Sequence, residues 1–153
     1  MVDNARAITT MKMILGDDAD VLTELADDPE LAEKLLSGKL DTATAACVDF
    51  THSPRGEPGQ PCPDSFLDCL ACPNGVATRR HLPRLAYLHA CLDQLRGTLD
   101  ATIWAPDWQT HYARLASLLD THTTTAERQA ALRGISDRDR TLVDDFLRRR
   151  FDP

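Results

Sequence analysis

The chain has 153 residues, of which 42% are hydrophobic and 27% are charged, as expected for one globular domain with a core of its own. Its net charge of −7 argues against autonomous DNA binding, which usually requires a strong basic surplus. No apolar run is long enough to cross a membrane, and the first residues lack the features of a signal peptide, so we expect a cytoplasmic protein.

Two short helices are expected in the N-terminal part. In the first, Val21, Leu22 and Leu25 share the inward face. The second begins at Pro29 and ends at Gly38, because proline suits the first helical turn and glycine suits the position after the last one.

Beyond these helices the composition changes. Residues 40–50 predict a further short helix that ends near Cys47. Residues 51–61 contain three prolines and two glycines, a composition that predicts a loop.

Helical spacing returns in the C-terminal half. The longest helix is expected to begin near Leu82, because Pro83 is tolerated only in the first turn. A second helix follows Pro106. The apolar faces of these two helices are formed by Leu85, Leu88, Leu92, Leu95 and Leu99, and by Trp108, Tyr112, Leu115 and Leu119.

Two further helices complete the expected set. Thr124 and Glu127 form a capping box at the start of a helix that ends at Gly134, and the last helix begins near Ser136. No run alternates between apolar and polar residues, so no sheet is expected. The sequence therefore predicts an all-α fold, an irregular helical bundle with a Cys-rich, metal-stapled loop. We expect a single domain over residues 1–153, with a metal-binding segment at 47–78 and a helical C-terminal part at 79–153.

Four of the five cysteines have a spacing typical of metal ligands. Cys47, Cys62, Cys69 and Cys72 follow the pattern C-x14-C-x6-C-x2-C. Two thiolates separated by two residues can bind one ion from a single turn, and a more distant pair can complete the tetrahedron. Because Pro73 disfavours a helical conformation at Cys72, the helix carrying Phe66, Leu67 and Leu70 should end there. Arg79 and Arg80 could offset the charge of a four-thiolate site.

Other readings of these cysteines remain open. They could be buried apolar residues without a ligand, or take part in redox or disulfide chemistry. Zinc is the favoured metal, and an iron–sulfur cluster is the alternative. His52 and His81 flank the segment as candidate substitute ligands, whereas Cys91 fits the core of the long helix.

Two resemblances to known families concern this segment. Cys62, Cys69 and Cys72 resemble the first three ligands of the iron–sulfur loop of endonuclease-type DNA glycosylases, but Thr78 stands where the fourth cysteine is expected. The stretch "CPDSFLDCLACPN" resembles uncharacterised actinobacterial cysteine-motif proteins that occur with tyrosine-recombinase (integrase-type) genes of mobile elements. That likeness implies an accessory or C-terminal domain associated with DNA integration.

The residues required for catalysis are not recognisable in the sequence. Tyr87 and Tyr112 lie on helical faces outside any catalytic motif, and no Ser/His/Asp set or phosphate-binding loop is evident. We therefore expect a non-catalytic metal-binding helical interaction module, accessory to DNA integration or recombination. It would have a protein partner, such as a recombinase complex, and weak or indirect contact with nucleic acid. The alternative is a small iron–sulfur redox or sensing protein.

Overall fold

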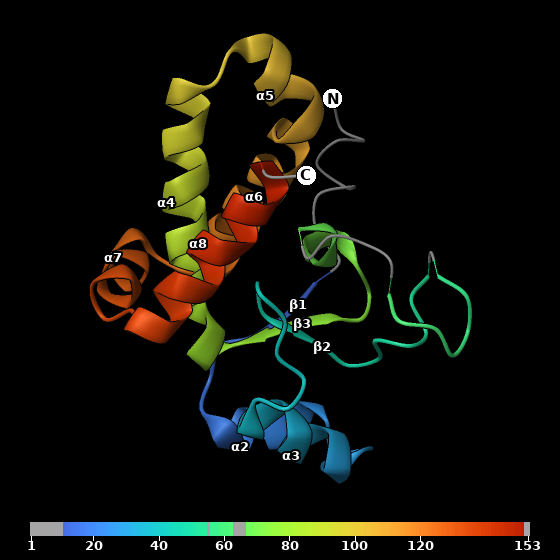
Figure 1. Ribbon diagram of the computed structural model, residues 1–153. Coiled ribbons are helices and arrows are strands. Elements are labelled where there is room, and N and C mark those ends of the chain that lie inside the picture. Colours follow the sequence, from blue (N-terminus) through green and yellow to red (C-terminus); the bar gives the residue numbers. More distant parts are fainter. Residues whose placement is uncertain (1–10, 55, 63–66, 152–153) are drawn as a thin grey trace. The chain divides into compact units, whose positions relative to one another are not determined.

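The computed structural model describes residues 11–54, 56–62 and 67–151. They divide into two compact units, the first ending at His81 and the second beginning at Leu82 (Figure 1). The fold is mostly helical, which confirms the expected helical character, but the first unit also contains a small sheet. No helix in these ranges is long and apolar enough to cross a membrane.

The sheet of the first unit has three short strands in the order β1-β3-β2. The central strand β3 (Gly75–Thr78) pairs in parallel with β1 (Lys12–Ile14) and antiparallel with β2 (Ala46–Cys47). The expectation of no sheet was therefore wrong. All residues of β3 are buried, so its sequence does not alternate, and the other two strands are too short to show a pattern.

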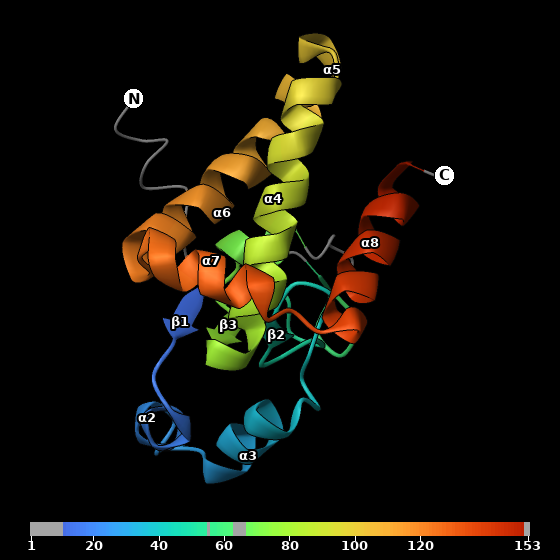
Figure 2. The ribbon, with the colours of Figure 1, turned by 90° about the vertical axis from the view of Figure 1, so that its left-hand side faces the viewer.

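Helices α2 (Asp18–Glu24) and α3 (Pro29–Ser37) lie side by side on the same side of the sheet in both views (Figures 1 and 2). The caps of α3 are as expected: Asp28 accepts from the backbone N–H of Leu31, and Gly38 adopts the left-handed conformation with φ 85°. Leu22 was expected to face inward but is 49% exposed. The core shared by helices and sheet consists of Ile14, Val21, Leu35, Ala46 and Val76.

Residues 40–47 form a tight hairpin instead of the expected helix. The Thr42 hydroxyl accepts from the backbone N–H groups of Thr44 and Ala45. The N–H of Cys47 donates to the carbonyl of Leu40 at 3.0 Å. A threonine hydroxyl that bonds nearby backbone groups offers the chain an alternative to helical hydrogen bonds, and this alternative prevails here.

The second unit consists of helices packed around a leucine-rich core. They are α4 (Leu82–Thr98), α5 (Ala101–Asp107), α6 (Gln109–His122), α7 (Thr125–Arg133) and α8 (Asp137–Phe151). The expected starts near Leu82, after Thr124 and near Ser136 are confirmed. Helix α5 was not expected, because it contains Pro106. The fully buried side chains of this unit include Leu85, Leu88, Leu92, Leu115, Leu118, Leu119 and Val143.

Candidate metal centre

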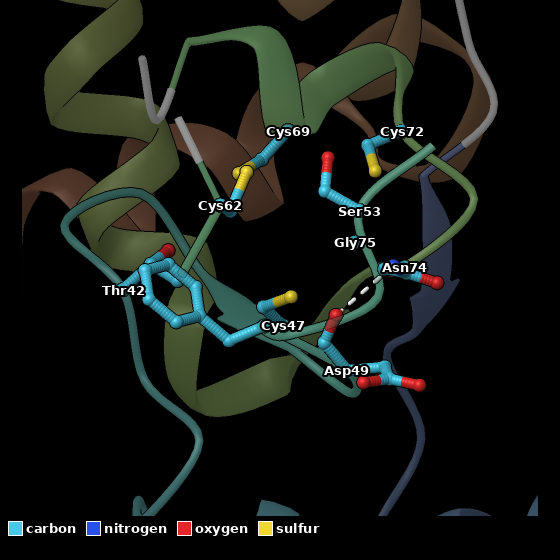
Figure 3. A pocket seen from close by; sticks show the side chains of 10 residues that line it. Thr42, Cys47, Asp49, Ser53, Cys62, Cys69, Cys72, Asn74 and Gly75 are labelled. Atoms are coloured by element: carbon cyan, nitrogen blue, oxygen red, sulfur yellow. Dashed lines mark hydrogen bonds between the residues drawn. The ribbon is translucent and has the colours of Figure 1, made fainter. Parts of the chain in front are cut away.

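Four cysteine side chains from three segments of the chain line one small cavity in the first unit (Figure 3). Cys47 ends β2, Cys62 lies in the loop that follows, Cys69 lies in the short 3-10 helix η1 (Asp68–Ala71), and Cys72 follows that helix directly. Figure 3 shows the four side chains distributed around the cavity. The four cysteines singled out by their spacing are therefore gathered at one place.

The turn between Cys69 and Gly75 positions two of these thiols. The N–H of Cys72 donates to the carbonyl of Cys69 at 3.1 Å, and the N–H of Gly75 donates to the carbonyl of Cys72 at 3.0 Å. Cys72 itself is extended, with φ −99° and ψ 135°. This confirms that the helical turn ends at Cys72, before Pro73. Of the helix residues named from the sequence, Leu67 and Leu70 are buried, and Phe66 lies outside the described residues.

Hydrogen bonds to Asn74 hold the segment after Cys47 against this turn. The N–H of Val48 donates to the carbonyl of Asn74 at 2.9 Å. The Asn74 side-chain amide donates to the carbonyls of Asp49 and His52, both at 3.1 Å. Asn74 was not identified from the sequence, where it was only one residue of a turn.

Burial and neighbouring thiols raise the pKa of two of these cysteines, Cys47 and Cys69. Burial, followed by the nearby thiols of Cys47, Cys72 and Cys62, raises the pKa of Cys69 to about 12. Burial is also the main reason why the pKa of Cys47 is raised. The raised pKa favours the protonated form of Cys47 and Cys69 at neutral pH, and a bound cation would reverse that preference.

The cysteines surround the cavity without meeting at coordination distance. Within the described ranges, no three side chains of His, Cys, Asp or Glu are close enough together to hold a metal ion. A zinc ion requires its four sulfur ligands at about 2.3 Å. The cavity measures about 10 Å³, which is space for roughly one water molecule or ion.

Neither flanking histidine lies among the residues that line the cavity. The ring of His52 is exposed, and its Nδ1 lies 2.7 Å from the Asp49 carboxylate. His81 is fully buried and bonds to Asp41. Cys91 belongs to α4 in the other unit.

The two arginines expected near the thiols bond elsewhere. Arg79 donates to the carbonyl of Leu15 at 3.1 Å. Arg80 forms a bidentate ion pair with Asp41, with distances of 2.8 and 2.9 Å. Neither lines the cavity. The side chains that do line it, besides the cysteines, are Thr42, Asp49, Phe50, Ser53 and Asn74.

A hydrogen-bonded series of Thr78, His81 and Asp41 was also missed in the sequence, because 40 residues separate the aspartate from the histidine. Such a series resembles the order of groups in hydrolytic triads. However, Thr78 is 4% exposed and His81 is 0% exposed, so a substrate has no access to the hydroxyl. The series is part of the packing of the first unit.

Comparison of the chain with protein-family models, with curated proteins and with solved structures gives no match.

Proposed function

We propose that Cys47, Cys62, Cys69 and Cys72 bind one structural Zn²⁺ and that the chain is a non-catalytic metal-binding helical interaction module. One observation carries the proposal: four thiols from three segments of the chain line a single cavity. Cysteine is often buried as an ordinary apolar residue, but packing alone gives no reason for four to converge in this way. Binding would deprotonate the thiols and draw the sulfurs together.

Two features favour a single ion over an iron–sulfur cluster. The cavity has space for roughly one ion, whereas a cluster of several iron and sulfide atoms would require the surrounding segments to move apart. Thr78, which stands at the position of the fourth cluster ligand in the DNA glycosylase loop, is buried and bonds to His81. The iron–sulfur redox or sensing protein remains the second reading to be tested.

The tyrosines of the second unit support a non-catalytic role. The Tyr87 hydroxyl donates to Asp144 at 2.7 Å, and this bond is the main reason why the pKa of Tyr87 is raised. Burial and a hydrogen bond to Asp93 raise the pKa of Tyr112. A tyrosine nucleophile would require the opposite shift.

The partner is proposed on different grounds. Resemblance of the cysteine segment to proteins that occur with integrase-type genes supports attachment to a recombination complex in the reducing cytoplasm, where free thiols persist. Residues 1–78 carry 14 acidic and 5 basic residues, whereas residues 79–153 carry 10 and 12. Neither part has the basic surplus of an autonomous DNA-binding domain, so contact with nucleic acid would be weak or indirect.

Elemental analysis after anaerobic purification tests the metal assignment. We expect about one zinc per chain, based on one four-thiolate site, and colourless protein. Cys69→Ser and Cys72→Ser should lose the metal, whereas Cys91→Ser should retain it. Brown protein that contains iron and absorbs at about 400 nm would instead establish the iron–sulfur alternative. Full metal content in all four single variants of the proposed ligands would show that the thiols are merely buried.

A further inference from the structure

Asp41 is the centre of a hydrogen-bonded cluster that lies apart from the thiols. Its carboxylate accepts from both terminal nitrogens of Arg80, at 2.8 and 2.9 Å, and from Nε2 of His81 at 2.8 Å. Arg80 also donates to the carbonyl of Leu35 near the end of α3, at 3.2 Å. The cluster therefore joins α3, the turn at Asp41 and the residues that follow β3.

The ring of His81 is fixed at both nitrogens. Its Nδ1 accepts from the backbone N–H of Thr78 at 3.0 Å, and because a backbone N–H can only donate, Nδ1 carries no proton. Nε2 therefore carries the proton and donates a hydrogen bond to the Asp41 carboxylate. With the ring fully buried, removing the Asp41 carboxylate would leave the Nε2–H group without this acceptor.

The backbone on either side of Asp41 connects the cluster to Cys47. Asp41 pairs with Ala46 across the hairpin, and the carbonyl of Leu40 accepts from the N–H of Cys47 at 3.0 Å. The next residue, Thr42, lines the cysteine cavity itself. Any displacement of Asp41 would therefore shift the strand that carries Cys47.

The other side of the cluster connects to the turn that carries Cys69 and Cys72. His81 bonds to Thr78 at one end of β3, and Gly75 at the other end pairs with Cys47. Strand β2 has only two residues, and so short a pairing specifies its register weakly by itself. The contacts of Asp41 provide an additional constraint on where β2 lies along β3.

We propose that Asp41, Arg80 and His81 are positioning residues for the metal site. They hold the hairpin on β3 in the register that places Cys47 opposite the turn of Cys69 and Cys72. This inference rests on the proposed zinc site, and it assigns to the Asp41 cluster the role of maintaining metal affinity without touching the metal. The cluster acts on the geometry of the four thiols through the backbone of two strands.

The test compares two variants that each break an ion pair. Asp41→Asn removes the charge at the centre of the cluster. Asp139→Asn is the matched control, because Asp139 accepts from Arg84 at 2.9 and 3.2 Å in the second unit and has an 18% exposed side chain, against 19% for Asp41. Zinc affinity is measured by competition with a chromogenic chelator, at a temperature where circular dichroism shows both variants folded.

We expect Asp41→Asn to weaken zinc binding by about tenfold or more, the scale seen when outer partners of metal ligands are removed. Asp139→Asn should bind zinc as the wild type does, even though its thermal midpoint falls. If Asp41→Asn does not fold, Arg80→Ala replaces it, because this change leaves the His81–Asp41 hydrogen bond in place. A smaller loss of affinity is then expected.

The outcomes separate the two proposals. Wild-type protein that binds no zinc overturns the proposed function, and the positioning role falls with it. Wild-type protein that binds zinc, together with a cluster variant that is less stable but binds equally tightly, overturns the positioning role alone. Equal losses of affinity in Asp41→Asn and Asp139→Asn would also overturn it, because the effect would then reflect general destabilisation.

Discussion

Gly75 pairs with Cys47 in the sheet and lies directly against the turn that carries Cys69 and Cys72. A Cβ atom at this position would come within 2.5 Å of the carbonyl oxygen of Cys69 and 3.3 Å of that of Cys72. Backbone atoms cannot move aside as a flexible side chain can. The absence of a side chain at Gly75 is therefore a condition for bringing β2 and the turn together.

We predict that Gly75→Ala destabilises the protein by about 1–3 kcal/mol, the usual range for overpacking, and weakens zinc binding. Gly97→Ala is the control, because Gly97 lies in α4 with nothing within 4 Å of its added Cβ. That change should be neutral or stabilising by up to about 1 kcal/mol, owing to the helix propensity of alanine. Urea unfolding measures the stability of both variants, and zinc titration measures their metal affinity. Equal stability of the two variants would contradict the claim that Gly75 has no room for a Cβ atom.

Asp41 gives the first unit a defined response to acid. Burial alone would raise the pKa of this carboxyl, but hydrogen bonds from His81 and Arg80 outweigh it and hold the pKa well below its usual range. The pKa of Asp41 is lower in the folded chain than in the unfolded chain. Asp41 therefore contributes its full stabilisation at pH values above the pKa that it has in the unfolded chain. This stabilisation is lost as the pH falls from about 4 toward the folded value.

The stability difference between wild type and Asp41→Asn should therefore be constant near neutral pH and shrink below about pH 4. Urea unfolding at about pH 7 and about pH 3 measures it. A difference that is as large at the lower pH as at the higher one would show that Asp41 contributes through packing and not through its charge.

Helix ends were the elements most readily predicted from the sequence. The caps at Gly38 and at Thr124–Glu127 depend on residues three or four positions apart, so the sequence contains all the information needed. The start of α4 near Pro83 follows from the same local rules. Leu22 was misplaced because α2 is only seven residues long, and its apolar spacing does not determine which flank faces the core.

The capping box of α7 offers a direct test at this scale. The Thr124 hydroxyl accepts from the N–H of Glu127, and the Glu127 carboxylate accepts from the N–H of Thr124. Thr124→Ala should cost about 1 kcal/mol, while Thr124→Ser should retain most of the stability because its hydroxyl can make the same bond. Thermal unfolding distinguishes the variants, and equal midpoints for alanine and serine would rule out the capping contribution.

The strands and the cluster at Asp41 could not be predicted by local rules. Ala46 and Cys47 become a strand only through pairing with residues 75 and 76, nearly 30 positions away along the chain. The bond from His81 to Asp41 likewise spans 40 positions. In contrast, the grouping of the four cysteines around one cavity could be predicted from the sequence. Their residue type and their spacing are typical of ligands that share one metal site.

At the scale of the whole molecule, the two units differ in what holds them together. The second unit has a core of buried leucines from α4 and α6, with Val143 from α8. The first unit contains the cysteine segment, in which the ordering of a loop rich in proline and glycine costs about 1–2 kcal/mol of backbone entropy per residue. A structural zinc site can offset such a cost, since apparent binding free energies of about 10–16 kcal/mol are known for zinc-finger peptides.

Removal of zinc by a chelator should therefore affect the units unequally. We predict that limited proteolysis then cleaves between residues 47 and 78, while a helical fragment that begins near Leu82 persists. Cys69→Ala should give the same fragments without chelator, and Cys91→Ala should remain resistant. Mass spectrometry of the fragments locates the cuts. Cleavage spread evenly along the chain would show that the metal does not act on this segment in particular.

X-ray absorption at the zinc edge of the purified wild-type protein tests the central claim most directly. Coordination by Cys47, Cys62, Cys69 and Cys72 predicts four sulfur atoms at about 2.3 Å from a single zinc, with no shell of nitrogen or oxygen ligands. A mixed shell containing nitrogen would mean that a histidine replaces one of the four cysteines. Fewer than four ligands from the protein, or zinc bound only through oxygen, would contradict the account of a closed structural site.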